Sequence, residues 1–364
     1  MVKSRKLSDS SSSFAAAPQP RSKNCTRALC IVAERTYGII TNIPFPTINT
    51  PDEIIIRVNA VGLNPIDWKS VEYNFCMPSF PWIGGREVAG TVEEIGINVK
   101  HFKPGDRVWA STYYRDRRAG TFQEFCVVPQ HTVLPLPAGL SFESGACLGV
   151  AALTAAMTLW KWLGVAMPIP EQSRNNFVTS SEPSYILIWG GSTITGQFAI
   201  QLARKSGLHV ITVTSGKTKA LAERLGAENV VVRDDKSNED IVNEIRAITR
   251  DNLTMAIDIV GNVTAAHCLQ ALSKTRSSLL APLAFLKEGE PVPVNVKIAQ
   301  IEMKRFIIED GNRVYAELLN RLVANGYVVI PSIQVLHGGL EMIEEGLSLL
   351  KQGDMNGRKL VVKI

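Results

Sequence analysis

The sequence predicts an α/β protein in which a β-rich domain is followed by a doubly wound parallel sheet covered by helices. From Thr26 to Phe125, strand-like runs alternate with Gly and Pro and show no long helical period, which is typical of a β-rich domain. From Tyr185 onward, apolar strand-like runs alternate with amphipathic segments, the pattern of a parallel sheet with crossover helices. The 364 residues, of which 45% are hydrophobic, are sufficient for two domains.

The composition argues against several classes of function. A net charge of +5 is far from the concentrated basic face of a nucleic-acid-binding protein. No apolar run approaches the roughly 18 residues of a membrane span. The six cysteines form no C-x-x-C pair and the five histidines form no H-x-x-x-H pair. We therefore expect a cytoplasmic protein without a metal site that binds neither nucleic acid nor membrane.

The N-terminal segment Met1–Lys23 is rich in Ser, Ala, Pro and basic residues and has too little apolar content to pack. We interpret it as a disordered tail. An organellar transit segment is the alternative, although Asp9 and the lack of an amphipathic repeat argue against it.

The stretch Tyr185–Gly207 has the pattern of a strand, a tight turn and a helix. Tyr185–Trp189 has the length and composition of a buried strand, and apolar residues recur at helical spacing from Ile194. The turn contains Gly190, Gly191 and Gly196. Such glycines let the backbone approach a pyrophosphate, whose charge is then held by free N–H groups at the helix N-terminus. The turn therefore predicts a dinucleotide site, although the usual G-x-G-x-x-G spacing is not met.

A second buried strand, His209–Thr214, completes a strand–helix–strand unit of a Rossmann domain. It is followed by Ser215, Gly216, Lys217 and Thr218. An NAD-binding unit usually carries an acidic residue here for the ribose 2′-hydroxyl, whereas hydroxyl groups and an ammonium would bind a 2′-phosphate. The sequence therefore predicts NADPH as the cofactor, the alternative being a solvated loop with an unrelated lysine. A hydrolase nucleophile at Ser192 is set aside because the G-x-S-x-G pattern fails at Ile194.

Four segments characterise the β-rich domain. They read VGLNPIDWK (Val61–Lys69), GGREVAG (Gly84–Gly90), FKPGDRVW (Phe102–Trp109) and GTFQEF (Gly120–Phe125). Taken singly, the glycine turns are ordinary corners between strands. In this order, and followed by the nucleotide unit, the segments resemble the medium-chain dehydrogenase/reductase superfamily from about Ala28 to the C-terminus. The resemblance implies a GroES-like catalytic domain joined to a Rossmann domain.

Zinc-dependent members of that superfamily carry a metal-ligating Cys and His at positions that match Asn64 and Arg86 in this sequence. Their four-cysteine structural lobe is also missing, because Tyr113–Gly120 is a short basic loop. Without thiolate and imidazole ligands, an open tetrahedral zinc site cannot form. The sequence therefore resembles the zinc-independent members.

Among those members, the sequence is most similar to the trans-acting enoyl reductases of fungal polyketide synthases. It shares their NP-x-D-aromatic-K segment at Asn64–Lys69, their GGST turn at Gly190–Thr193 and their C-terminal tail at Gly338–Ile364. The resemblance implies a monomer that acts in secondary metabolism. Its partner would be a polyketide synthase, including synthases fused to a peptide synthetase. Hydride would pass from NADPH to the β-carbon of an α,β-unsaturated thioester on the acyl carrier protein.

Two alternatives to that function remain open. The first is a stand-alone NADPH quinone or enone reductase of the same fold. The second, from another class, is an NADPH-binding sensor or scaffold without turnover. The fold alone does not separate these functions.

The resemblance also implies roles for individual residues. Lys69 is the candidate catalytic donor or proton source, the alternative being an ordinary surface lysine or a cofactor contact. Thr154, in the helix-like Gly149–Trp162, would bond the thioester carbonyl or the cofactor amide, unless its hydroxyl bonds its own helix. Arg233 stands where the group often has Tyr and would contact a phosphate. The expected cofactor contacts are Ile66, Asp67, Trp68, Lys69, Ser192, Thr193, Ile194, Thr195, Ser215, Gly216, Lys217, Thr218, Arg233, Leu280, Ala281, Leu360 and Val361.

The remaining segments continue the Rossmann pattern and then return to the first domain. Strands are expected at Asn229–Val232, Met255–Val260 and Leu279–Ala281, with Asp258 as a structural carboxylate. The strands Val328–Leu336 and Leu360–Ile364 should rejoin the first domain. We therefore predict a tail (1–23), a catalytic domain (24–160), an NADPH-binding domain (161–310) and a return to the catalytic domain (311–364). The basic loop Arg115–Arg118 could dock an acidic carrier protein, but a solvated loop is the simpler interpretation.

Overall fold

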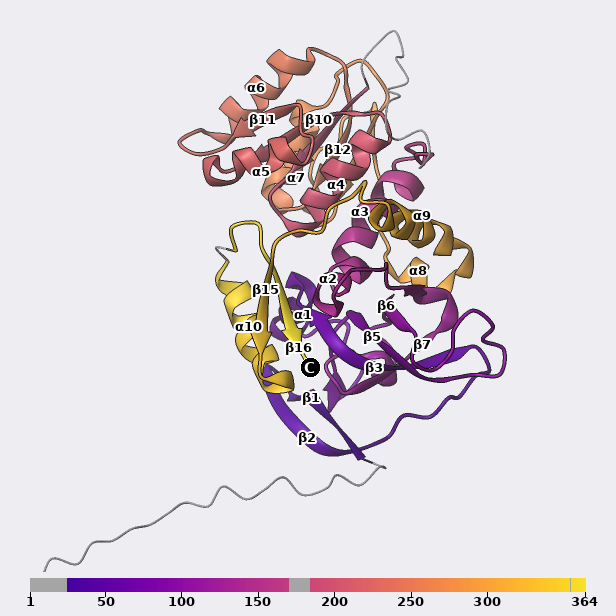
Figure 1. Ribbon diagram of the computed structural model, residues 1–364. Coiled ribbons are helices and arrows are strands. Elements are labelled where there is room, and N and C mark those ends of the chain that lie inside the picture. Colours follow the sequence, from indigo (N-terminus) through magenta and orange to yellow (C-terminus); the bar gives the residue numbers. More distant parts are fainter. Residues whose placement is uncertain (1–24, 170–183, 354) are drawn as a thin grey trace, which may run out of the picture.

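The structure, a computed structural model, describes residues 25–169, 184–353 and 355–364. It has two lobes, and the chain runs from the lower lobe in Figure 1 to the upper lobe and back. The predicted tail 1–23 lies outside the described residues.

The first lobe is built mainly of β-strands. One sheet has the order β15-β16-β3-β5-β6-β8, with β7 paired to β3, and a three-stranded sheet has the order β2-β1-β4. The core of this lobe is formed mainly by Val, Ile and Leu side chains, contributed by strands of both sheets and by α10. The elements are β1 (Cys25–Ala33), β2 (Thr36–Pro44), β3 (Glu53–Gly62), α1 (Pro65–Glu72), β4 (Trp82–Ile83), β5 (Glu87–Ile95), β6 (Arg107–Ser111), η1 (Arg117–Ala119), β7 (Phe125–Pro129), η2 (Gln130–Thr132) and β8 (Val133–Pro135).

Helix α1 interrupts the β-rich region, and the periodicity of the sequence does not predict it. Pro65 takes its first position, and the Asp67 carboxylate accepts a hydrogen bond from the Asn64 N–H at 2.8 Å. These are typical features of a helix N-terminus. The helix has only eight residues, too few to show a clear apolar period.

An apolar helical segment joins the two lobes. It comprises α2 (Phe142–Gly145), α3 (Leu153–Met157) and the π-type turns η3 (Leu148–Ala152) and η4 (Thr158–Trp162) on either side of α3. Phe142–Trp162 is long and apolar enough to cross a membrane, but 72% of its apolar window is buried inside the protein. Within the described residues it is therefore a core helix of the fold.

The second lobe is a parallel sheet with the strand order β11-β10-β9-β12-β13-β14. Numbered along the chain, this is the 3-2-1-4-5-6 order of a dinucleotide-binding Rossmann domain. Alternate residues of β9 pack on opposite faces: Ile186 and Ile188 join the core on the α4 side, and Leu187 joins the core on the α6 and α7 side. The predicted doubly wound sheet is confirmed. Its elements are β9 (Tyr185–Trp189), α4 (Ile194–Lys205), β10 (His209–Thr214), η6 (Gly216–Thr218), α5 (Lys219–Arg224), β11 (Asn229–Val232), α6 (Asn238–Thr249), β12 (Leu253–Asp258), α7 (Asn262–Ala271), β13 (Ser278–Pro282) and β14 (Val296–Ile298).

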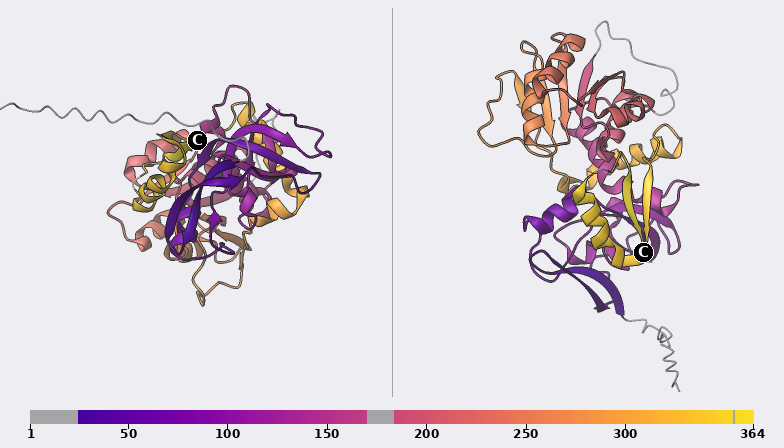
Figure 2. Two further views of the ribbon diagram at one scale, coloured as in Figure 1. Left: turned by 90° about the horizontal axis from the view of Figure 1, so that it is seen from below. Right: turned by 90° about the vertical axis from the view of Figure 1, so that its left-hand side faces the viewer.

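The chain then returns to the first lobe, where its C-terminus lies (Figure 2). Strand β16 pairs parallel with β15 and antiparallel with β3, and α10 packs against α1. Strand β15 begins at Ile333 rather than at the predicted Val328, because Pro331 cannot donate to a strand ladder. The elements of this return are α8 (Lys304–Ile308), η7 (Asp310–Asn312), α9 (Arg313–Ala324), β15 (Ile333–His337), η8 (Gly339–Glu341), α10 (Met342–Gln352) and β16 (Lys359–Lys363).

A buried ion pair connects β16 to β5 of the first lobe. The Lys359 ammonium pairs with the Glu87 carboxylate, and the two side chains are 2% and 0% exposed. Lys359 also donates to Asn64 Oδ1 at 2.8 Å. Glu87 accepts hydrogen bonds from Asn64 Nδ2 (2.9 Å) and from the Val150 N–H (2.8 Å). Both charges are therefore compensated in the interior, as buried charges need to be.

Replacing Lys359 by Met should be strongly destabilising, because the Glu87 carboxylate would remain buried without its cation. Removing one partner of a buried pair costs about 3–5 kcal/mol. The matched control is Lys351→Met, which removes the exposed pair between Lys351 and Glu72 and should change the stability far less, because solvent screens an exposed pair. Urea unfolding followed by circular dichroism measures both losses, and equal small losses would contradict the prediction.

Candidate dinucleotide and substrate site

The turn after β9 presents free backbone N–H groups at the N-terminus of α4. Thr193 caps this helix, because its Oγ1 accepts a hydrogen bond from the Gly196 N–H (3.0 Å) and donates to the Gly190 carbonyl (2.8 Å). The N–H groups of Ile194 and Thr195 have no acceptor among the described residues. Residues 192–195 are half-buried, so an anion could reach these donors.

The glycines of this turn form a cradle that side chains would fill. Gly190 has a φ of +102°, a left-handed conformation that favours glycine. A Cβ on Gly191 would overlap the Thr212 hydroxyl of β10, and a Cβ on Gly196 would overlap the Gly190 carbonyl. The turn thus has the close backbone approach that the pyrophosphate of a dinucleotide needs.

Lys217 follows β10 and Arg233 follows β11, two neighbouring strands that run parallel. The Arg233 N–H donates to the Thr214 carbonyl at 2.9 Å. Both cations are exposed, and neither has an ion pair with a described residue. The Ser215 and Thr218 hydroxyls are hydrogen-bonded to each other at 3.1 Å, and Thr218 is buried. Thr218 therefore shapes the loop, whereas Lys217 and Arg233 are open to a ligand.

Asp234 is a member of this site that the sequence reasoning missed. Its Oδ2 accepts a hydrogen bond from the Gly216 N–H at 2.8 Å. Asp234 follows β11, and the carboxyl ends of neighbouring parallel strands meet at one edge of a sheet; its position just after a strand was the available signal. The loop thus holds a carboxylate beside the two cations Lys217 and Arg233.

Lys69 lies on α1 with its ammonium 5.7 Å from the centroid of the Trp68 ring. The Lys351 ammonium of α10 lies at the same distance from that ring, but it also pairs with Glu72 at 2.9 Å. Lys69 is half-buried and has no ion pair with a described residue. Of the two lysines over Trp68, Lys69 is therefore the one that is available to a ligand.

The loop before β16 connects the dinucleotide turn with α1. Gln197 Nε2 of α4 donates to the Ser192 carbonyl (3.0 Å) and to the Gly357 carbonyl (2.8 Å). Gly357 is two residues from Lys359, a separation of at most about 7 Å, and Lys359 bonds Asn64 at the start of α1. The two predicted parts of the site, far apart in the sequence, are thus brought together by the C-terminal strand.

The Asp67 carboxylate, an expected cofactor contact, is buried beside Arg86. Its side chain is 1% exposed and lies 3.8 Å from Arg86 Nε. Burial raises the pKa of this carboxyl to about 6, and the Arg86 charge opposes the shift. The Asp67 Oδ2 accepts the hydrogen bond that begins α1. The neighbouring side chains of Ile66 and Trp68 are half-buried.

Four other expected cofactor contacts lie inside the sheets. Leu280 and Ala281 are buried in β13, and the Leu280 carbonyl accepts from the Ala299 N–H at 2.8 Å. Leu360 and Val361 are buried in β16, and the Leu360 carbonyl accepts from the Leu63 N–H at 3.0 Å. Buried backbone groups of this kind are engaged within the fold. The Leu280 and Leu360 carbonyls are thus engaged within the fold, and cofactor contacts at these four residues stay predictions.

Thr154 and Asp258 are the remaining residues for which the sequence predicts a role. Thr154 is half-buried in α3, and its hydroxyl has no hydrogen bond with a described residue. Asp258, at the end of β12, accepts from the Thr264 hydroxyl (2.6 Å) and from the Gly261 N–H (3.1 Å). Burial raises the pKa of Asp258 to about 6, although these hydrogen bonds oppose the shift. Asp258 thus has the contacts of a structural carboxylate that begins α7.

The residues at the positions of zinc ligands do not fit a zinc ion. The Asn64 amide is used by Glu87 and Lys359, and Arg86 is itself a cation. Burial raises the pKa of the nearby Cys147 thiol to about 12. In the part of the chain that the structure describes, no three His, Cys, Asp or Glu side chains gather where they could hold a metal ion.

Comparisons with known proteins agree with this architecture. Residues 50–138 match the alcohol dehydrogenase GroES-like domain, and residues 195–323 match the zinc-binding dehydrogenase family. The enoyl reductase component of lovastatin nonaketide synthase from Aspergillus terreus is 31% identical over 339 residues, covering 86% of this chain and 89% of the relative. A trans-enoyl reductase from Aspergillus japonicus is 29% identical over 318 residues, covering 86% and 90%. The solved CurK enoyl reductase has the same fold, with a TM-score of 0.75 at 18% identity over 94% of this chain and 99% of that chain.

Proposed function

This chain belongs to the medium-chain dehydrogenase/reductase family of oxidoreductases, as do the enoyl reductases it matches, and on that basis we propose that it is a trans-acting enoyl reductase. The proposed reaction is the NADPH-dependent reduction of an α,β-unsaturated thioester on the acyl carrier protein of a polyketide synthase. The observation that carries this proposal is the similarity, over nearly the whole of both chains, to the enoyl reductase component of a nonaketide synthase.

The residues of the dinucleotide turn support a nicotinamide cofactor in this role. When bound, the reduced nicotinamide supplies the hydride. The free N–H groups of Ile194 and Thr195 would hold the pyrophosphate. Lys217 and Arg233 would hold the 2′-phosphate through charge-assisted hydrogen bonds, against the opposing charge of Asp234. We propose NADPH because the two positive charges of Lys217 and Arg233 exceed the single negative charge of Asp234, so the loop favours a 2′-phosphate.

Lys69 would act on the substrate. Hydride arrival at the β-carbon places negative charge on the thioester oxygen, and the α-carbon then takes a proton. A nearby ammonium can stabilise that charge or deliver the proton. Thr154 would position the thioester carbonyl through its free hydroxyl. None of these steps requires a metal, which agrees with the chemistry of Asn64 and Arg86.

The partner and compartment are part of the same proposal. We propose a cytoplasmic monomer, and six free cysteines fit a reducing compartment.

Only some of the arginines in the basic loop Arg115–Arg118 are available to bind an acidic carrier protein. Arg118 is held by Glu53 (2.8 Å) and Asp116 (2.9 Å), whereas Arg115 and Arg117 are exposed.

The proposed reaction is tested by following NADPH oxidation with an enoyl pantetheine thioester and, separately, with a simple quinone at equal concentration. We expect thioester turnover with little quinone reduction. Quinone turnover with an inert thioester would instead indicate a stand-alone quinone reductase. Cofactor binding without turnover of either acceptor would indicate a sensor or scaffold.

Lys217→Ala should weaken NADPH binding about tenfold or more while leaving NADH binding nearly unchanged, because only NADPH carries the 2′-phosphate. The control is Lys219→Ala, an exposed lysine two residues away that lies near Glu223 and should change neither affinity. Titration of each nucleotide by tryptophan fluorescence gives the dissociation constants. An equal loss for the two nucleotides would contradict the 2′-phosphate assignment.

Lys69→Ala should lower kcat for the thioester by about 100-fold while changing NADPH affinity little, as expected for a group that acts in the transition state. Lys351→Ala is the matched control, since its ammonium lies at the same 5.7 Å from the Trp68 ring. Steady-state kinetics separate kcat from KM. If Lys69→Ala only weakens cofactor binding, Lys69 is a cofactor contact and not a catalytic group.

A further inference from the structure

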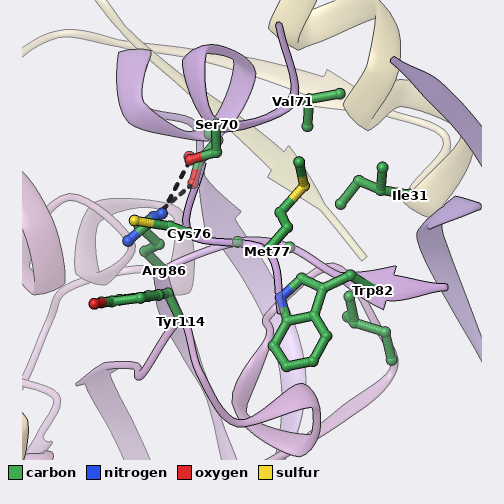
Figure 3. Close-up of a pocket in the computed structure, with 12 residues that line it drawn as sticks. Ile31, Ser70, Val71, Cys76, Met77, Trp82, Arg86 and Tyr114 are labelled. Atoms are coloured by element: carbon green, nitrogen blue, oxygen red, sulfur yellow. Dashed lines mark hydrogen bonds and ion pairs between the residues drawn. The ribbon is translucent and has the colours of Figure 1, made fainter. Parts of the chain in front are cut away.

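A small pocket beside α1 has one polar wall and one apolar wall (Figure 3). The polar wall is formed by Asp67, Ser70, Arg86 and Tyr114. The apolar wall is formed by Ile31, Val71, Met77 and Trp82. The free volume is about 20 Å³, enough for one small polar group such as a single oxygen.

Arg86 is the cation of this pocket and makes one side-chain hydrogen bond among the described residues. Its side chain is only 17% exposed. Nη2 donates to Ser70 Oγ at 3.0 Å, whereas Nε lies 3.8 Å from Asp67 Oδ1, which is beyond a hydrogen bond. Most of its N–H groups therefore have no acceptor among the described residues. Asp67 also lines the pocket, and its Oδ1 is buried without a hydrogen-bond partner among the residues that the structure describes.

The surrounding chain holds the guanidinium in place. Its carbon lies 5.1 Å from the centroid of the Tyr114 ring, within the range of a cation–π contact. The preceding Gly85 has a φ of +87°, and a Cβ there would overlap the Thr121 hydroxyl. The Arg86 carbonyl accepts from the Thr112 N–H at 2.9 Å. The Arg86 backbone is thus held by a hydrogen bond, and one face of its guanidinium lies over the Tyr114 ring. Most of its guanidinium N–H groups have no acceptor among the described residues.

We propose that Arg86 is the hydrogen-bond donor for an acceptor oxygen of the acyl substrate, a proposal that rests on the function proposed above. A half-buried guanidinium that makes one side-chain hydrogen bond among the described residues favours an electron-rich oxygen over an apolar group. The small cavity admits one oxygen but neither a whole phosphate group nor a hydrocarbon segment, so the chain that bears the oxygen would lie outside the cavity. The oxygen is either the thioester carbonyl, where negative charge develops, or a hydroxyl or carbonyl farther along the chain.

The test compares two enoyl pantetheine thioesters, one with an unsubstituted chain and one with a hydroxyl group on the same chain. Arg86→Met should lower kcat/KM by about 10- to 100-fold, the loss of a hydrogen bond from a charged donor, and Arg86→Lys should restore part of it. An equal loss for both substrates assigns the thioester carbonyl. A loss confined to the hydroxylated substrate assigns the chain oxygen.

A matched control and a binding measurement separate this role from a structural one. Arg107 also lies over an aromatic ring, that of Phe142 at 4.5 Å, and donates to the Leu140 carbonyl. Arg107→Met should leave both substrates unaffected. Isothermal titration with the saturated thioester should show weaker binding to Arg86→Met, with NADPH affinity unchanged.

One further variant guards against a folding defect, since Arg86→Met leaves the buried Asp67 without its neighbouring cation. The double variant Asp67→Asn/Arg86→Met removes both charges and should show the same substrate defect. Unchanged kinetics and unchanged thioester affinity in both variants would overturn the proposal. An inactive wild-type enzyme with both thioesters would instead overturn the proposed function, so the two failures are distinguishable.

Discussion

The ion pair between Lys359 and Glu87 is the interaction on which the arrangement of the first lobe depends. Its charges come from strands β16 and β5, and Asn64 and the Val150 N–H complete it. Buried charges are tolerated only with such partners, and separating them is costly. The pair therefore fixes four segments relative to one another: the C-terminal strand, β5, the start of α1 and the helical connection to the second lobe.

The same constraint positions the candidate site. Three segments carry it, namely the dinucleotide turn, the loop before β16 and helix α1. Gln197 joins the first two by bonding the Ser192 and Gly357 carbonyls, and Lys359 joins the loop to Asn64. The return of the chain from the Rossmann lobe into the β-rich lobe thus links the dinucleotide turn to the start of α1, the helix that carries Lys69. This gives the C-terminal tail a positioning role.

Two cations near α1 lie in different environments and suit different tasks. Lys69 is half-buried over Trp68 and is free of ion pairs with described residues, so its ammonium can move with a ligand. Arg86 is held by its backbone, by Ser70 and by the Tyr114 ring. A rigid planar donor suits the fixed recognition of an oxygen, whereas a flexible ammonium suits charge stabilisation or proton delivery.

The sequence by itself determined the doubly wound sheet, its glycine turn and the loop with Lys217, because strand periods, glycines and strand-end residues are local signals. Only the tertiary structure decided which of the expected contacts are available. Asp67, Leu280 and Leu360 are used by helix capping and by buried backbone hydrogen bonds. Asp234 and Arg86 join their sites through neighbours distant in sequence. Burial and pairing depend on contacts between segments, which a local pattern does not contain.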